Sequence, residues 1–453
     1  MFGIVPWITV CLWIMILPAK SISSKSSSLR HTCAVIGGGI AGLSCAHHLS
    51  DSFAVTLFDT GRLRPGGRAS SRLPGDPAKK DDLGEHHHIS KCVVDHAAQV
   101  LFVPDHEARF AEFSRQVKDW ERIGVVTRFP EGSLYNIYSR SSTKKCIELE
   151  PFVGQPAYFG SSTMGIASIS NALAETSNFE IQQNVWVSPS NGARYMPKTR
   201  QWKVTASGKV LGYFDRLIVA HNGKCADRLM SKTPAKAIHD LLRVNFAPSV
   251  PQHGGKRMTL NSIYSLTIAL PKNSAIAACL PANFLGGFIQ NDKALRFLSC
   301  QSRKYESMEK DVEIWTILSS SNFAKSHKAP QEFLPNEVVE EVTLLLIEAL
   351  ESLFGVTVGS IKPIERRLQL WGAGVPLNTW ENGKGFLYDA ESAVGVCGDW
   401  LLDSSIAGAW TSGRLLADHL KTKEAVSAGF DGTFVASQGA SNTGIAAINE
   451  KFR

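Results

Sequence analysis

The chain has 453 residues, of which 44% are hydrophobic and 20% are charged, so it is long enough to form two domains with buried cores. Its formal net charge of +7 is expected to be spread over the whole chain. Proteins that bind nucleic acid usually concentrate their basic residues in a stripe. The composition therefore favours a globular protein with no nucleic-acid partner.

Cysteines and histidines show no spacing typical of a metal site. The nine cysteines contain no C-x-x-C pair. Cys33 and Cys45 flank a glycine-rich turn, and we expect them to be buried thiols rather than disulfide partners. The cluster His86–His88 follows several charged residues, which favours a solvated loop. The sequence therefore predicts no structural metal.

The first 32 residues form a leader in two parts. Residues 1–19 carry no charged side chain and contain the apolar run Ile8–Leu17, which predicts a signal peptide ending at Ala19 or an uncleaved signal anchor. Residues 20–32 contain Ser, Lys and Arg but no acidic residue, as transit peptides do. We expect entry into the secretory pathway, followed by secretion or by delivery to a plastid. After removal of the leader, no membrane span is expected.

A strand, a glycine turn and a helix are predicted directly after the leader. A short apolar run leads into the sequence G-G-G-I-A-G over residues 37–42, and residues 43–49 have helical apolar spacing. Gly37 would permit the tight turn, Gly39 would let the backbone approach a pyrophosphate, and Gly42 would let the helix pack closely. A dinucleotide is expected at the helix N-terminus. The residues expected to contact it are Gly37, Gly39, Ile40, Ala41 and Gly42.

The next apolar run ends in Asp59, 22 residues after Gly37, where a carboxylate would accept hydrogen bonds from a ribose. The segment P-G-G-R-A-S-S-R over residues 65–72 then resembles the G-G-R-x-x-[ST]-R segment of renalases, flavin amine oxidases and related FAD enzymes. Its glycines would leave room for the cofactor, and Arg68 would neutralise the pyrophosphate. The resemblance implies FAD, held here by Asp59, Arg62, Gly67 and Arg68.

A second motif lies near the other end of the chain. The pair Gly398-Asp399 follows a short apolar strand, and residues 405–413 open an amphipathic helix. These residues resemble the C-terminal FAD motif of the same enzymes, G-D followed by G-A-x-x-S-G. The resemblance implies that Gly398 and Asp399 contact the ribityl chain or the pyrophosphate. It also places the helix N-terminus, at Ala409, near the flavin pyrimidine edge, where a positive helix end would stabilise reduced flavin.

Between the two motifs, the sequence predicts a strand meander over residues 182–220, and the resemblance implies that the backbone of Val185 contacts the adenine. The runs Ser262–Leu270 and Glu313–Leu318 predict strands, and Asn336–Leu353 predicts a helix. We therefore expect an α/β protein with a Rossmann-type, amine oxidase-like FAD-binding domain and a second α+β substrate domain. The expected boundaries are 33–104, 156–225 and 385–423 for the FAD-binding domain, 105–155 and 226–384 for the substrate domain, and 424–453 for a disordered tail.

Three further segments resemble renalase sequences: Val94–Gln99, Tyr158–Gly165 and Leu370–Pro376. They supply three candidates for a substrate pocket, Gln99, Met164 and Trp371, for which packing in the core is the alternative. The chain departs from the resembled family where a substrate should meet the flavin. The departures are Ala97, Val100, Ser162, Thr163, Met164, Gly372, Ala373 and Ala407. No catalytic residue is identified from the sequence.

The resemblance implies an FAD-dependent oxidoreductase. A small organic donor would pass a hydride to the flavin, and O2 or another acceptor would reoxidise it. Enzymes of the resembled group act on dihydronicotinamide isomers, amines, carotenoids or porphyrins, and all these classes stay open. The alternatives are a protein that keeps FAD as a structural or sensing ligand without turnover, and a plain NAD dehydrogenase.

Overall fold

The computed structural model describes residues 30–77, 88–139, 147–176, 178–306, 309–331 and 333–437. Nearly all of the predicted leader, together with His86, His87 and residues 438–453 of the predicted tail, lies outside the described residues. The chain divides after Arg30, and every described helix and strand lies beyond that point. The first described strand begins at Thr32, the last residue of the predicted leader.

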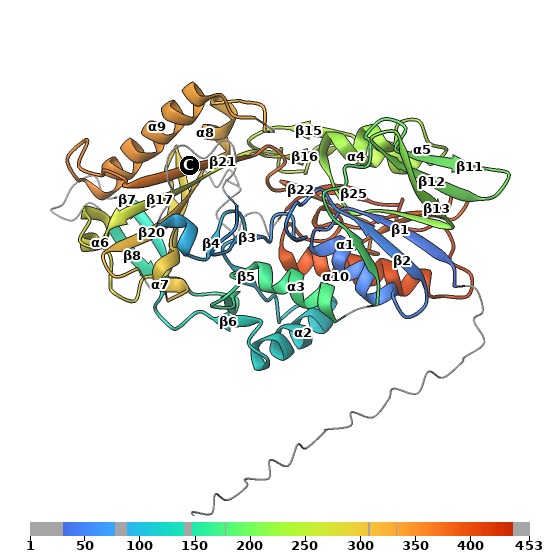
Figure 1. Cartoon of the computed structure of the whole chain (residues 1–453), viewed down its shortest axis with the longest axis horizontal. Helices are drawn as coiled ribbons and strands as arrows, with labels where there is room; N and C mark the ends of the chain where they lie inside the picture. The colour runs from blue at the N-terminus through green and yellow to red at the C-terminus, as the bar shows by residue number, and fades with distance from the viewer. Residues whose placement is uncertain are drawn as a thin grey trace, which may run out of the picture. The chain divides into compact units, whose positions relative to one another are not determined.

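A six-stranded sheet in the order β10-β2-β1-β14-β24-β23 forms one layer of the fold (Figure 1). Its strands are β1 (Thr32–Ile36), β2 (Ala54–Phe58), β10 (Glu180–Gln182), β14 (Arg216–Val219), β23 (Leu387–Asp389) and β24 (Val394–Val396). All neighbours pair in parallel except β23 and β24. Helix α1 (Ile40–Leu49) connects β1 to β2. The predicted Rossmann-type layer is therefore confirmed.

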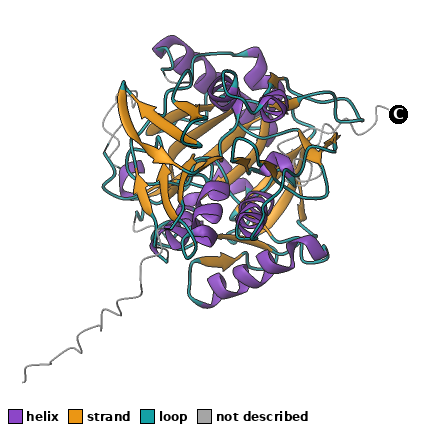
Figure 2. Ribbon diagram, turned by 90° about the vertical axis from the view of Figure 1, so that its right-hand side faces the viewer, coloured by secondary structure: helices purple, strands orange, loops and turns teal. Residues whose placement is uncertain are grey.

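The two faces of this sheet belong to different cores. Cys33 and Val35 of β1 pack with the helices α1, α2 (Ala111–Arg122), α3 (Ala167–Glu175) and α10 (Ile406–Leu420). Ala34 and Ile36 point the other way, because successive side chains of a strand alternate between its faces. They pack with β11 (Ala193–Met196), β12 (Gln201–Ala206), β13 (Lys209–Phe214), α4 (Gly223–Met230) and α5 (Lys236–Leu242). Figure 2 shows helices lying on both sides of the strands.

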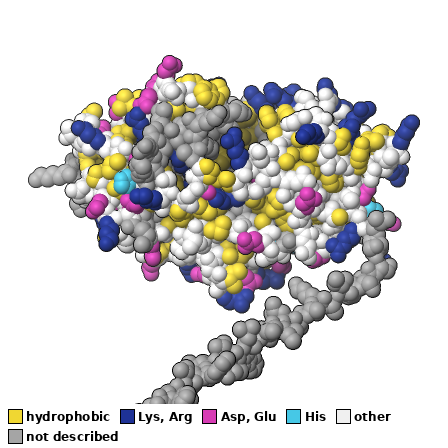
Figure 3. Space-filling model, in the orientation of Figure 1, with side chains coloured by type: hydrophobic (Ala, Val, Ile, Leu, Met, Phe, Trp, Pro, Cys, Tyr) yellow, Lys and Arg dark blue, Asp and Glu magenta, His cyan; other side chains and the backbone are white. Residues whose placement is uncertain are grey.

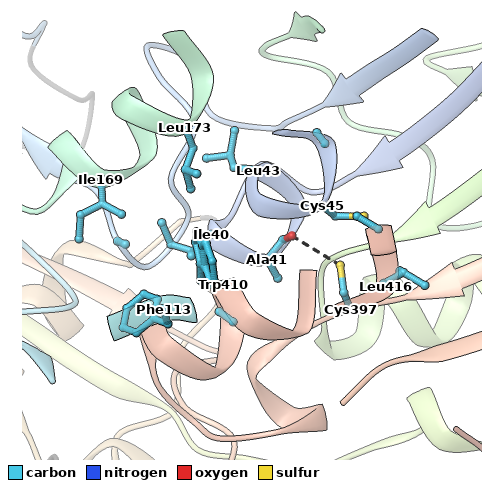
Figure 4. Packing of buried hydrophobic residues seen from close by; sticks show 14 of the residues in the cluster. Ile40, Ala41, Leu43, Cys45, Phe113, Ile169, Leu173, Cys397, Trp410 and Leu416 are labelled. Carbon is cyan, nitrogen blue, oxygen red and sulfur yellow. Dashed lines mark hydrogen bonds between the residues drawn. The ribbon is translucent and has the colours of Figure 1, made fainter. Parts of the chain in front are cut away.

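Helices α1 and α10 cross closely although they come from opposite ends of the chain (Figure 4). A Cβ atom on Gly413 would lie 2.2 Å from the carbonyl oxygen of Ala41, so only glycine fits at the crossing. The Sγ atom of Cys397 donates a hydrogen bond to the same oxygen over 3.6 Å. Cys33 and Cys45 are both buried thiols in this core. The crossing therefore holds the N-terminal and C-terminal motifs side by side.

A seven-stranded sheet in the order β21-β17-β20-β19-β18-β7-β8 forms a second layer. Its strands are β7 (Leu134–Ser139), β8 (Ile147–Pro151), β17 (Ile263–Pro271), β18 (Gly286–Gln290), β19 (Leu295–Cys300), β20 (Val312–Ser319) and β21 (Glu365–Trp371). Helix α9 (Asn336–Phe354) covers one face. The strands predicted at 262–270 and 313–318 and the helix predicted at 336–353 are confirmed as β17, β20 and α9.

Shorter elements complete the described fold. They are β3 (Ser71–Arg72), β4 (Val94–Asp95), β5 (Leu101–Phe102), β6 (Val126–Arg128), β9 (Ala157–Gly160), β15 (Val244–Phe246), β16 (Met258–Leu260), β22 (Asn378–Glu381), β25 (Thr433–Ala436), α6 (Ala275–Cys279), α7 (Gln301–Lys304) and α8 (Ser321–Ser326). Among the described residues, short 3₁₀ helices span Ile89–Lys91, Ala108–Phe110 and Asp399–Leu401. Within the described ranges, no helix is both long and apolar enough to cross a membrane.

Several segments pack differently from what their predicted domain boundaries imply. Helix α2, expected in the substrate domain, packs with the first sheet through Phe113 and Trp120. Helices α4 and α5 also pack with that sheet. The prediction of a disordered tail is wrong for residues 424–437, because β25 pairs with β22 and buries Phe434. The Gly- and Ser-rich composition of the tail concealed this apolar anchor.

Candidate dinucleotide-binding site

Successive glycines after β1 are required for different physical reasons. Gly37 has a φ of +111°, which residues with a Cβ rarely adopt. A Cβ on Gly38 would lie 2.7 Å from the carboxyl carbon of Asp59. A Cβ on Gly39 would have no atom within 4 Å, whereas one on Gly42 would lie 2.0 Å from the carbonyl oxygen of Gly37. Gly39 is therefore the position where the backbone borders open space, as an approaching phosphate requires.

Helix α1 begins at this open position. Gly39 is its N-cap and offers no side chain to the first-turn amides, and no acidic residue lies in the first turn. The first hydrogen bond within the helix runs from the amide of Leu43 to the carbonyl of Gly39, at 2.9 Å. Ile40 and Ala41, the first two residues of the helix, are buried. A helix N-terminus without a side-chain cap suits an anion such as a pyrophosphate.

Asp59 closes one side of the glycine turn. Its carboxylate accepts hydrogen bonds from the amides of Gly38 and Gly61, each at 3.0 Å. Burial raises the pKa of Asp59, and the backbone hydrogen bonds oppose that rise. The amide of Val185 donates to the carbonyl oxygen of Asp59 at 2.9 Å. The residues predicted to contact the ribose and the adenine are therefore neighbours in the structure.

The loop over residues 65–68 lies against the glycine turn itself. The amide of Gly66 donates to the carbonyl of Gly38 at 2.7 Å, and a Cβ on Gly67 would lie 3.3 Å from the Cα of Gly39. The glycines of this loop are thus needed for packing against the turn as well as for room beside a ligand. Two arginines precede the loop and differ in setting.

Arg62 is exposed, while Arg64 makes a bidentate ion pair with Asp76 at 2.7 and 2.6 Å. Arg64 also donates to the carbonyl of Ser71 at 3.2 Å. It therefore anchors the strand that follows the loop. Arg62 stays a predicted cofactor ligand. Arg64 was not singled out from the sequence, because only the fold shows that it faces Asp76 and the following strand.

Arg68 connects the N-terminal and C-terminal motifs. Its guanidinium lies 2.7 Å from the carboxylate of Asp399 and also donates to the carbonyl of Gly374 at 2.9 Å. The side chain of Asp399 is 7% exposed and that of Arg68 is 33% exposed, so the pair is only partly screened by water. Two predicted cofactor ligands that are far apart in the sequence are thus one contact in the structure.

The start of α10 completes this side of the site. The amide of Gly398 donates to Ser412 Oγ at 3.0 Å, and that hydroxyl donates to the carbonyl of Gly385 at 2.6 Å. Ser405 caps the helix by accepting from the amide of Gly408 at 3.0 Å. Ala409 lies in the first turn and is buried. The helix is therefore held by buried hydroxyl contacts close to Asp399.

Trp371, a predicted pocket residue, lies beside the same loop. Its ring stacks on His96 with a centroid distance of 5.6 Å and an interplanar angle of 10°, and its Nε1 donates to the His96 carbonyl at 2.9 Å. Ser70, two residues after Arg68, has its Oγ 3.4 Å from Nε2 of His96. Met164 is half-buried on another loop. The stacked pair of His96 and Trp371 was not predicted, because stacking depends on tertiary contact.

Gln99, the third pocket candidate, belongs to a buried polar network. It donates to the carbonyl of Asp95 at 2.8 Å and accepts from Gln301 Nε2 at 2.9 Å. At its centre, Lys304 Nζ lies 2.8 Å from the Asp95 carboxylate, and both side chains are 0% exposed. Tyr305 also donates to this carboxylate. Burial lowers the pKa of Lys304, while the charge of Asp95 opposes that change.

This network joins the two sheets. Asp95 lies on β4, which pairs with β3 directly after the Arg68 loop, and Ser71 of β3 donates to its carboxylate at 2.7 Å. Lys304 ends α7, which follows β19 of the second sheet. Asp95 could be noticed in the sequence, because it follows an apolar run. No sequence pattern marks its partner Lys304. Among the described residues, no group of His, Cys, Asp or Glu could hold a metal ion.

Known proteins share this fold. A family model described as an NAD(P)-binding Rossmann-like domain matches residues 35–117. Similar solved structures include a protein from Exiguobacterium described as a protoporphyrinogen oxidase, with 11% identity, a TM-score of 0.56, and coverage of 87% of this chain and 99% of that one. Cyclohexylamine oxidase from Brevibacterium oxydans has 11% identity, a TM-score of 0.55, and coverage of 87% and 100%.

Putrescine oxidase bound to putrescine is also similar, with 12% identity, a TM-score of 0.51, and coverage of 86% of this chain and 99% of that one. At such identities the similarity shows the fold alone. The chain therefore has a mixed α/β fold like that of these oxidases, and its residues 35–117 match the model of a Rossmann-like domain.

Proposed function

We propose that this chain is an FAD-dependent oxidoreductase of the renalase and amine oxidase-like group. The contact between Arg68 and Asp399 carries the proposal, because it joins two motifs that the same FAD enzymes use at one site. The open Cβ direction of Gly39 and the start of α1 without a side-chain cap fit a pyrophosphate. The solved structures with this fold include flavin oxidases, which also supports the proposal.

The protein's contribution would be binding and orientation. Asp59 would accept ribose hydroxyl groups, and Arg68 would be shared between Asp399 and the pyrophosphate. Bound FAD would accept a hydride from a small organic donor and pass the electrons to O2 or another acceptor. The stacked rings of His96 and Trp371, beside the Arg68 loop, would form one wall of the donor's pocket.

The cofactor is tested first, by the absorption spectrum of the purified protein and of the flavin released by heat or acid. Arg68→Gln should retain much less flavin than wild type, while Arg128→Gln, which changes an exposed arginine outside both motifs, should retain nearly as much. A colourless wild-type protein that binds NAD instead would contradict the proposal.

Turnover is tested next, by adding dihydronicotinamide isomers, amines, tetrapyrroles or carotenoids without oxygen and recording bleaching of the flavin. Admission of air should restore the colour. A protein that retains flavin but is bleached by none of these donors would be assigned to the non-turnover class, with FAD as a structural or sensing ligand.

A further inference from the structure

The basic residues of the chain are concentrated in one segment. Residues 194–257 contain 13 Lys and Arg but only 3 Asp and Glu, a net charge of +10, whereas the whole chain carries +7. The even spread expected from the composition is therefore wrong. This segment contains β11, β12, β13, α4 and α5. Figure 3 shows Lys and Arg side chains gathered at the upper right, over these elements as Figure 1 labels them.

The antiparallel meander of β11, β12 and β13 presents part of this charge on its outer face. Trp202 and Val204 of β12 are fully buried against the first sheet, so Lys203 between them points away from it. In the sheet register, Arg194 lies opposite Lys203 on one side and Tyr213 lies opposite it on the other. We call the outward residues Arg194, Lys203, Val210 and Tyr213, together with Lys209, which is exposed at the turn before Val210, the meander face.

The meander face holds like charges next to each other. Arg194 and Lys203 are direct cross-strand partners, an arrangement that destabilises a sheet unless an anion lies between or above the pair. The ion pairs formed among the described residues include neither of them, nor Lys209. Asp215 and Asp227, two of the three acidic residues of the segment, are engaged by Thr32 and His239. The positive charge therefore stays available to a partner.

Apolar side chains are exposed beside this charge. Tyr213 is 48% exposed and Val210 is 49% exposed. Val187 bridges to Ala206, which brings Trp186, 58% exposed, close to the turn between β12 and β13. Aromatic residues that border lysine and arginine suit the interface of a bilayer, where rings enter the headgroup layer while cations meet anionic lipids. A phosphate backbone would leave Val210 at the turn without an apolar partner, whereas the acyl region of a bilayer supplies one.

We propose that the meander face, with Trp186, docks the protein peripherally on a bilayer that contains anionic lipids. The basic residues of α4 and α5 strengthen the positive electrostatic field that attracts an anionic bilayer. This role concerns the outer layer of the first sheet and does not depend on the identity of the cofactor.

The test is sedimentation of the full chain with vesicles of phosphatidylcholine alone or mixed with phosphatidylserine. We expect binding to the mixed vesicles that weakens as salt is raised. The variant R194Q/K203Q/K209Q should bind them roughly 100-fold less tightly. The matched variant K118Q/K325Q/K362Q removes three exposed charges elsewhere and should change binding by less than about threefold. Trp186→Ser should weaken binding at all salt concentrations. Wild type and all variants carry the leader, so any affinity of the leader for lipid does not affect the comparison between them.

Equal losses in the two triple variants would contradict the proposal, as would equal binding of wild type to the two kinds of vesicle. Tighter binding of a single-stranded oligonucleotide than of the mixed vesicles would assign the surface to nucleic acid instead. Thermal unfolding of each variant verifies folding. If the first triple variant is unfolded, the single variants R194Q and K209Q are used, and a loss in neither would overturn the proposal.

Discussion

The dinucleotide site and the buried polar network that joins the two sheets are constructed in opposite ways. The glycine turn works because side chains are absent: at Gly38 and Gly42 any Cβ would meet an atom closer than 3 Å. The network works because charged side chains are present and matched, with Lys304 and Asp95 fully buried together. Added side-chain atoms should therefore destabilise the glycine turn, whereas removal of a charged group should destabilise the network between the sheets.

The largest effect is expected in this network. Lys304→Met leaves the Asp95 carboxylate buried without its cation and should lower the free energy of unfolding by about 3 to 5 kcal/mol. Urea denaturation measures this loss. Adding Asp95→Asn to Lys304→Met should recover part of it, because no charge then remains unpaired. Lys310→Met, at an exposed lysine of the same segment, is the control, and a similar loss there would refute the special role of the pair.

The next largest effect is expected at the glycine turn. Gly42→Ala forces a Cβ against the carbonyl oxygen of Gly37 and should lower the free energy of unfolding by about 1 to 3 kcal/mol. Gly39→Ala has open space and ordinary φ, so it should cost under about 1 kcal/mol. It should nevertheless weaken cofactor retention, because the added methyl group occupies the path of the phosphate. Equal destabilisation by both changes would show that Gly39 is a packing position too.

A smaller effect concerns pH in the core beside the glycine turn. His48 packs edge-on against Trp410 at 5.2 Å, and burial lowers its pKa to about 4. As the pH falls from about 6.5 to about 4, the unfolded chain binds a proton that the folded chain does not, so the free energy of unfolding decreases. Partial solvent screening reduces the expected loss to about 1 to 2 kcal/mol.

Unfolding measured across that pH range in wild type and His48→Gln tests this assignment. The variant should lose less stability than wild type between these pH values, whereas His253→Gln, at an exposed histidine, should follow the wild-type curve. Parallel curves for wild type and His48→Gln would place the acid sensitivity at other groups.

Much of the fold could be predicted from the sequence because its signals are local. The strand, glycine turn and helix at residues 33–49 and the helix at 336–353 depend on spacing between near neighbours. The tail was mistaken because β25 is stabilised by pairing with β22 and by burial of Phe434, neither of which composition reveals. Arg64 was not singled out for the same reason, since only the fold brings Asp76 to Arg64.

By itself, the sequence determined the glycine turn, the acid that closes it and the order of the two motifs, since these follow from backbone geometry over a few residues. Tertiary structure alone decided which side chains meet across the chain: Arg68 with Asp399, Lys304 with Asp95, and Arg194 with Lys203 on the meander face. The physical reason is that a buried or paired charge depends on what surrounds it, and those surroundings come from segments that are far apart in sequence.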